Sequence, residues 1–221
     1  MTDDETVPLK AAPDPETPEA EPEPGPERRT LGRDLLAAGA LAVVLAALGF
    51  PLAMLWQVIT PRVEYVTVDG GWYSVETYSD GFVLGDLYFA GLGLILGIVV
   101  AIAAWTAMRA RRGPVVLLGL VVGSVACQVV AWRIGRHEWE QFWEAVRAAP
   151  PGVHMWRPPA VLFVDLDPGA AWGAARVGDF TEALSSLQLG GLAVMALAAV
   201  FTYTICAGWS RRPNLRSDVP E

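Results

Sequence analysis

Residues 87–134 read LYFAGLGLILGIVVAIAAWTAM-RARRG-PVVLLGLVVGSVACQVVAWRI, and this stretch decides the fold of the chain. Each long apolar run is free of charge until Arg133 and is long enough to cross the hydrocarbon core of a bilayer as a helix. The five residues 109–113 between them can form only a tight turn. The stretch therefore predicts an antiparallel pair of membrane-spanning helices over 87–108 and 114–134.

Two further apolar runs, 35–59 and 187–208, complete a predicted bundle of four spans within residues 31–210. The fold class is thus a membrane all-α protein, which agrees with a chain of 221 residues of which 53 % are hydrophobic. Pro51 lies inside the first run and removes a backbone donor, so a kink or break is expected there.

The arginines predict the orientation. Nine of them flank the span ends on one side, and the much longer loops on the other side hold only scattered arginines mixed with acids. The nine are Arg28, Arg29, Arg33, Arg109, Arg111, Arg112, Arg211, Arg212 and Arg216. The positive-inside rule then predicts a multi-pass protein of the plasma membrane with both termini in the cytoplasm.

The acidic net charge belongs to a tail. Residues 1–27 hold nine acids and one base, Lys10, and the rest of the chain balances. Residues 1–30, rich in Pro and Glu, are expected to be disordered and cytoplasmic, as is the short tail 211–221. A docking tail for a partner is one interpretation, and a solvated, dispensable tail is the commoner one. The single lysine against fifteen arginines suggests a GC-rich bacterial genome.

The two outer loops are expected to form a small α+β cap. Loop 60–86 alternates around Asp69-Gly70-Gly71 and predicts a hairpin, and loop 135–186 predicts a helix over 137–148 and a strand over 160–166. The helix carries Trp139, Phe142, Trp143 and Val146 on one face. This face either packs on the cap strands or lies in the lipid interface, and both alternatives stay open.

No standard catalytic or cofactor motif is present, so no catalytic residue, cofactor or metal ligand is assigned. His137 and His154 lie among loop carboxylates and are interpreted as solvated residues. Cys127 and Cys206 fall at depths that differ by roughly 15–20 Å, which excludes a disulfide between them. The cytoplasmic arginines are explained by topology, which leaves no support for nucleic-acid binding.

Small residues recur every four positions in the second and third spans and form two ridges that allow close helix approach. The ridges are Gly93, Gly97 and Ala101, and Gly119, Gly123, Cys127 and Ala131. The simplest arrangement packs them within the chain, although a homo-oligomer or a partner helix could use one. Arg133, near the outer end of its span, is either an interfacial anchor or an anion contact paired with Asp86 or Glu64.

The chain also resembles a known family in five short stretches. They are Leu55-Trp56, Thr60-Pro61-Arg62-Val63, Val68-Asp69-Gly70-Gly71, Arg111-Arg112-Gly113-Pro114 and Ala131-Trp132-Arg133-Ile134-Gly135. They are similar to an uncharacterised actinobacterial family of small four-span membrane proteins, known only as a domain of unknown function. The resemblance covers residues 35–208, implies no chemistry, and draws attention to Pro61, Arg62, Asp69, Gly70, Gly71 and Arg133.

Three functions follow as hypotheses. The leading one is a non-enzymatic accessory or scaffold protein whose outer cap binds a cell-envelope component or a partner membrane protein. The second is a small transporter or permease-like subunit for a lipid or anionic solute, with Arg62 and Arg133 at its mouth. The third is a membrane-bound envelope enzyme using carboxylates such as Glu64, Asp69 or Asp80. Arg62, Asp69 and Arg133 are the candidate binding residues, and the lipid bilayer is the one certain partner expected.

Overall fold

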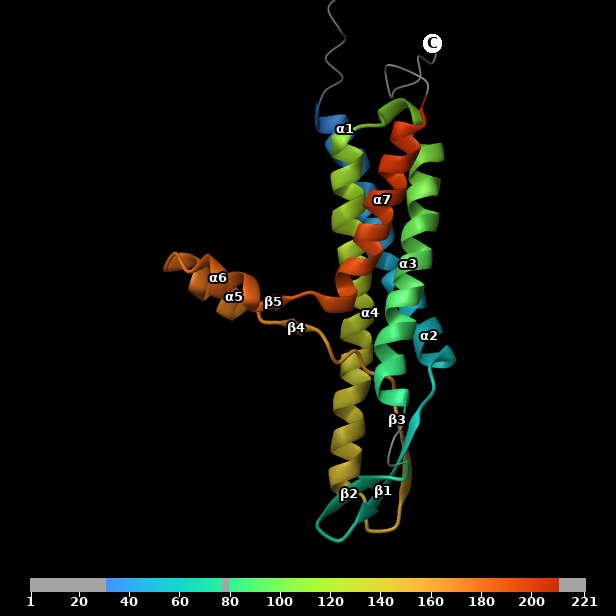
Figure 1. Ribbon diagram of the computed structural model, residues 1–221, viewed down its shortest axis with the longest axis vertical. Helices are drawn as coiled ribbons and strands as arrows, with labels where there is room; N and C mark the ends of the chain where they lie inside the picture. The colour runs from blue at the N-terminus through green and yellow to red at the C-terminus, as the bar shows by residue number, and fades with distance from the viewer. Residues whose placement is uncertain (1–30, 77–79, 211–221) are drawn as a thin grey trace, which may run out of the picture.

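The computed structural model describes residues 31–76 and 80–210, so both predicted tails lie outside the described residues (Figure 1). The elements in chain order are α1 (Leu31–Ala47), α2 (Gly49–Ile59), β1 (Val63–Val68), β2 (Gly71–Ser74), α3 (Gly81–Ala107), η1 (Arg109–Arg111), α4 (Pro114–Ala148), β3 (His154–Arg157), β4 (Asp165–Leu166), α5 (Pro168–Arg176), α6 (Phe180–Ser185), β5 (Leu187–Gln188), η2 (Gly190–Ala193) and α7 (Val194–Gly208).

Four helical stretches within the described residues are long and apolar enough to cross a membrane, and each contains most of one of the four predicted apolar runs. They are Gly32–Ile59, Val83–Ala107, Pro114–Ala148 and Gly190–Gly208. Figure 1 shows them as an elongated bundle. We call the end formed by residues 108–113 the turn end, and the opposite end, where β1, β2 and β3 lie, the sheet end.

The first span is interrupted at Leu48, as its proline predicts. Helix α1 stops at Ala47 and α2 starts at Gly49, while Leu48 N–H still bonds the carbonyls of Val44 at 3.2 Å and Leu45 at 3.1 Å. Pro51 has no N–H to offer Ala47, so one rung of the helical ladder is missing there. The first span therefore consists of two consecutive helices, α1 and α2.

The helix of the third span does not stop at residue 134. Residues 137–148 are helical as predicted, but they belong to this same helix and not to a separate one. Helix α4 runs without interruption for 35 residues, from Pro114 to Ala148. Polar residues begin at Arg133, but polarity does not end a helix, and only the Pro150-Pro151-Gly152 turn does so. The loop after the third span therefore begins at residue 149.

The bundle is built from close helix approaches at small residues. A methyl group added at Gly119 or Gly123 of α4 would collide with α1, at Ala38 or at Ala42 and Leu45. One added at Gly97 of α3 would collide with α7 at Met195 and Ala198, and one at Gly93 would meet Gln128. The two ridges thus pack within the chain on different partners, α4 on α1 and α3 on α7.

The sheet at the sheet end has the order β2-β1-β3 and is antiparallel throughout. The predicted hairpin is confirmed: Val68 pairs with Gly71, and Gly70 takes a positive φ of 82° in the turn. The third strand of this sheet is His154–Arg157 and not the predicted strand over 160–166, of which only Asp165–Leu166 is a strand, paired with β5 in a second sheet. The rest of the predicted segment follows Pro158-Pro159, and the backbone N–H groups of Leu162 and Phe163 bond the carboxylate of Asp86 instead of a strand.

The aromatic face of α4 packs on this sheet, which decides between the two alternatives left open above. Phe142 and Val146 form a second, smaller core with Val63 and Tyr65 of β1. The ring of Trp143 lies 5.8 Å from that of Tyr65 and 4.6 Å from that of Trp72 on β2. The last four turns of α4 and the three strands therefore form one folded unit.

Candidate functional site

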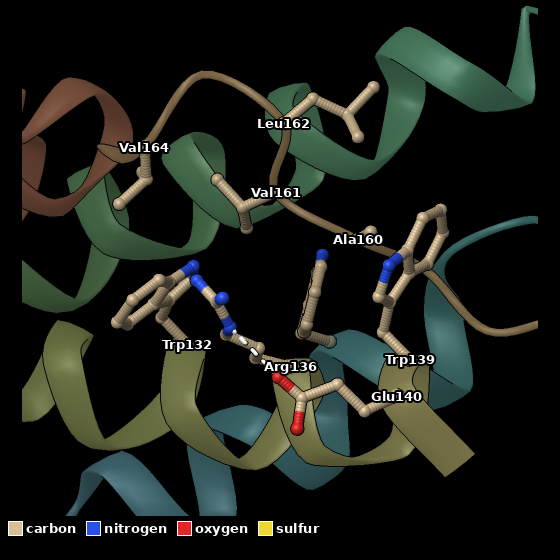
Figure 2. A pocket seen from close by; sticks show the side chains of 9 residues that line it. Trp132, Arg136, Trp139, Glu140, Ala160, Val161, Leu162 and Val164 are labelled. Carbon is tan, nitrogen blue, oxygen red and sulfur yellow. Dashed lines mark hydrogen bonds and ion pairs between the residues drawn. The ribbon is translucent and has the colours of Figure 1, made fainter. Parts of the chain in front are cut away.

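A cleft lies along α4 where this helix passes from the bundle to the sheet. The segment 160–164 forms its opposite wall, and its volume is about 310 Å³ (Figure 2). Trp56, Trp132, Arg136, Trp139, Glu140, Ala160, Val161, Leu162 and Val164 line it. A second hollow of about 400 Å³, lined by Trp132, Arg133, Arg136, His137, Glu140 and Leu166, shares three of these residues. We call the two together the α4 cleft.

Helical spacing explains why these side chains meet. Trp132, Arg136, Trp139 and Glu140 stand at i, i+4, i+7 and i+8 on α4, which places them on one face of the helix. Arg133 and His137 lie beside this face, one turn apart. The cleft therefore depends on α4 being continuous through residue 134, because a chain that turned there would separate Trp132 from Trp139.

The segment 160–164 is held in place by the start of α3. Asp86 accepts hydrogen bonds from the backbone N–H groups of Leu162 at 3.1 Å and Phe163 at 3.4 Å. A side chain at Gly85 would collide with the carbonyl of Ala160, so glycine permits this close approach. Val161 and Val164 then point toward the α4 side of the cleft, whereas the side chain of Leu162, which also lines it, points away from Arg136 (Figure 2).

The cleft is cationic with aromatic walls. Arg136 Nε lies 3.1 Å from Glu140 Oε1, and its guanidinium stands 5.5 Å from the ring of Trp132. Arg133 forms no ion pair with any residue in the described ranges, and His137 contacts only the amide of Gln141, at 3.0 Å. Two guanidinium groups thus face one carboxylate, and the surplus positive charge suits an anion.

A buried arginine closes the cleft toward the sheet. Arg157 of β3 is only 3 % exposed, and its guanidinium lies 4.8 Å from the ring of Trp139. Burial lowers the pKa of Arg157 below its usual value, while the neighbouring Tyr65 opposes this shift. The contact fixes the indole of Trp139 between the cleft and the small core of the sheet.

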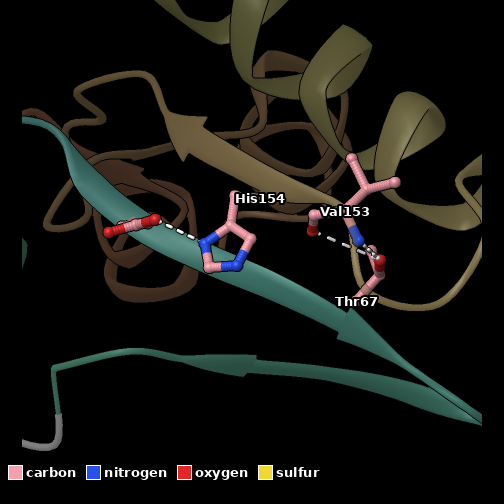
Figure 3. Close-up of polar contacts among 4 residues, drawn as sticks. Thr67, Val153 and His154 are labelled. Atoms are coloured by element: carbon pink, nitrogen blue, oxygen red, sulfur yellow. Dashed lines mark hydrogen bonds and ion pairs between the residues drawn. The ribbon is translucent and has the colours of Figure 1, made fainter.

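The structure does not bring the three predicted binding residues together. Arg133 lines the cleft, whereas Arg62 is exposed before β1 and Asp69 is exposed in the hairpin turn. The proposed acidic partners of Arg133 are engaged elsewhere, Asp86 with the 160–164 segment and Glu64 with His154 Nδ1 at 2.6 Å (Figure 3). Of the sequence candidates, Arg133 alone belongs to this site.

Sequence reasoning missed the rest of the cleft, although a signal was present. Trp132 and Arg136 stand at i and i+4 across the boundary drawn at residue 134, and Arg136 and Glu140 repeat this spacing, which supports a continuing helix. Trp132 and Trp139 share that face. The wall formed by 160–164 had no such signal, because it depends on a hydrogen bond to a residue 76 positions earlier.

Other polar groups lie inside the bundle below the cleft. Ser124 Oγ and both amide atoms of Gln128 are fully buried and have no hydrogen-bond partner among the described residues, and the same holds for Gln57 Nε2. Cys127 and Cys206 are free thiols. Across residues 31–76 and 80–210, no three His, Cys, Asp or Glu side chains gather as metal ligands would.

Comparison with known proteins gives a family and no activity. Among curated proteins and among solved structures, none matches this chain. The family described as "Protein of unknown function (DUF2567)" matches residues 45–217, which include the break after α1, the sheet, the cleft and all of α3, α4 and α7. Since this match covers most of the chain, the protein belongs to the DUF2567 family.

Proposed function

We propose that the turn end faces the cytoplasm and the sheet end faces the cell envelope, in a multi-pass protein of the plasma membrane. The observation in support is the arginine distribution, since the turn holds Arg109, Arg111 and Arg112 and further arginines adjoin both chain ends. The bias toward arginine over lysine supports an actinobacterial source. Cysteine labelling from either side of intact cells tests the orientation: a thiol placed in the hairpin turn should react with an impermeant reagent, and a thiol at residue 110 should not.

In this orientation the α4 cleft lies at the outer boundary of the hydrocarbon. About 20 residues of helix cover the roughly 30 Å of bilayer core, and this distance from Pro114 ends at Arg133. Tryptophan is favoured at that depth, where Trp56, Trp132 and Trp139 lie. Arg133 and Arg136 thus stand where lipid headgroups begin.

The protein functions in this proposal as a non-enzymatic accessory or scaffold protein that holds an anionic amphiphile of the envelope at its outer face. The observation that carries it is the pairing of two guanidinium groups with a hydrophobic wall in one cleft. A guanidinium binds phosphate or carboxylate oxygens in a bidentate way, and the wall at 160–164 accommodates the apolar part next to the headgroup.

The test uses the full chain in phosphatidylcholine nanodiscs with and without phosphatidylglycerol, with retained lipid counted by native mass spectrometry. We expect phosphatidylglycerol to be retained selectively, and Arg133→Ala with Arg136→Ala to reduce this retention about tenfold or more. Arg62→Ala is the matched control, because it removes an exposed arginine outside the cleft. Equal retention by the wild type, the double variant and the control, each eluting as a single folded species, would contradict the proposal.

A second candidate is passage of a small anionic solute, and the buried polar groups favour it. Gln128 and Ser124 lie on α4 one and two turns deeper than Trp132, and both are fully buried without partners in the described structure. Such groups are expensive in a membrane and often mark a solute path. Uptake lost on Gln128→Leu at unchanged expression supports transport, and unchanged uptake of anions in vesicles with and without the protein argues against it.

A further inference from the structure

Residues 165–188 form a separate arm beside the bundle. The arm consists of β4, α5, α6 and β5, and in Figure 1 it leaves the bundle sideways, across the direction of the spans. Its two short strands pair antiparallel, Leu166 with Leu187, so both ends of the arm are tied at one root. Sequence analysis assigned no structure to this region beyond residue 166.

The arm has its own local order. Asp167 Oδ1 accepts a hydrogen bond from Ala170 N–H at the start of α5, and Asp179 Oδ1 accepts one from Glu182 N–H at the start of α6. These are N-terminal caps, and Gly178, with a φ of 83°, makes the turn between the two helices. The arm is therefore a capped helical hairpin.

This hairpin leaves its large hydrophobic side chains uncovered. Trp172 is 68 % exposed, Val177 82 %, Phe180 70 % and Leu184 73 %, and helix α6 has no buried residue. Phe180 and Leu184 share one face of α6, while Glu182 lies about 200° around the helix from Phe180. A patch of this kind marks a surface that is covered by something else.

The root of the arm fixes its depth. Leu166 lines the α4 cleft together with Arg133, the residue about 20 positions along the helix from the turn end. After β5 the chain reaches Gly190, the first residue of the fourth span, within two residues. The arm thus leaves the bundle at the edge of the hydrocarbon, and its exposed side chains continue the apolar surface of the spans through Leu187 and Leu189.

We infer that the arm is a membrane-surface element, with Phe180 and Leu184 inserted between lipid headgroups of the same leaflet that surrounds the cleft. Amphipathic helices bind this zone with their apolar face among the acyl chains and their charged face in water, and Glu182 supplies the water-facing side. The exposed face is apolar, so its insertion does not require anionic lipid. The arm differs in this from the cleft, where the proposed binding does require an anionic lipid.

The experiment places a spin label on each face of α6 in the full chain, in phosphatidylcholine nanodiscs. Leu184→Cys and Glu182→Cys are made in a Cys206→Ala background, since Cys127 is fully buried. We expect the label at 184 to collide mainly with oxygen and the label at 182 mainly with a water-soluble nickel complex. Strong nickel contact at both positions overturns the inference, and so does protection of position 184 from both reagents, which would show a protein partner or a second copy.

A second measurement avoids labelling. Phospholipids brominated near the headgroup quench nearby indole fluorescence, and Trp172→Phe removes one exposed indole from the arm. The fluorescence contributed by Trp172 is the difference between the wild-type protein and Trp172→Phe, and we expect these lipids to quench it. Trp209→Phe, at an indole that is 85 % exposed and directly follows α7 at the turn end, is the comparison for the substitution itself. An unquenched Trp172 difference places the arm in water and overturns the inference.

Discussion

The indole Nε1 of Trp56 donates a hydrogen bond of 2.9 Å to the carbonyl oxygen of Gly85. This bond ties the end of the first span to the start of the second, 29 residues later. The same ring is 1 % exposed, packs edge-on against Phe89 at 5.2 Å and fills the space opened by Gly135 of α4. The side chain of Trp56 therefore links α2, α3 and α4 at the cleft.

Trp56→Phe should destabilise the bundle. The change removes the hydrogen bond to Gly85 and part of the buried ring, at a cost of about 1 to 3 kcal/mol. A lower unfolding midpoint of the detergent-purified protein checks this. Trp209→Phe, at a position that is 85 % exposed, should leave the midpoint unchanged. Equal midpoints for both variants would contradict the importance of the joint.

Gly97→Ala should weaken the packing of α3 on α7. The added methyl group would collide with the carbonyl of Met195 and with Ala198, and overpacking of this kind costs about 1 to 3 kcal/mol. Gly91→Ala is the control on the same helix, because it meets nothing within 4 Å and replaces glycine by a better helix former. Thermal unfolding in detergent should show a loss for the first variant only.

Thr67→Val should loosen the sheet without affecting the spans. The hydroxyl of Thr67 accepts from Val153 N–H at 3.1 Å (Figure 3). It also donates to the carbonyl of Pro150 at 2.6 Å, and the two bonds hold the turn between α4 and β3. The isosteric valine leaves these partly buried groups without their partner, at a cost of about 0.5 to 1.5 kcal/mol.

Faster hydrogen exchange over residues 149–157 would report this loss. Thr106→Val provides the comparison, since the hydroxyl of Thr106 bonds only carbonyls of its own helix at an exposed position. Unchanged exchange over 149–157 would show that the Thr67 hydroxyl does not hold the turn.

Arg157 and Trp139 should be energetically coupled. The buried guanidinium stands 4.8 Å from the indole ring, and a desolvated contact of this type is worth about 2 kcal/mol. A double-mutant cycle of Arg157→Met and Trp139→Leu, read by unfolding of the sheet under limited proteolysis, should return a coupling of this order. Additive effects of the two changes would show that the ring contact contributes nothing.

The sequence predicted what depends on local pattern and left out what depends on long-range contacts. The four spans, the break near Pro51 and the hairpin around Gly70 each follow from composition or spacing within a few residues. The end of α4 was placed at residue 134 because hydropathy falls there, although no helix-stopping residue occurs before Pro150. A fall in hydropathy indicates where a helix leaves an apolar environment, whereas only helix-stopping residues indicate where the helix itself ends.

The cleft shows the same division. Arg133 stood out because arginine is rare near the end of an apolar run. The wall opposite it could not be predicted, because 160–164 is a short apolar run typical of a strand and is held instead by the carboxylate of Asp86. The arm was missed for a related reason: its short helices carry no long periodic pattern, and their order comes from caps at Asp167 and Asp179.

The unbroken α4 also makes the molecule mechanically uneven. At 1.5 Å per residue it is a rod of roughly 52 Å that begins at the turn end and finishes inside the sheet. A continuous helix moves as one body. A force on the sheet would therefore tilt the whole of α4 and displace residues 109–113 at its other end. The first span beside it is interrupted at Leu48, so we expect the bundle to bend there before α4 does.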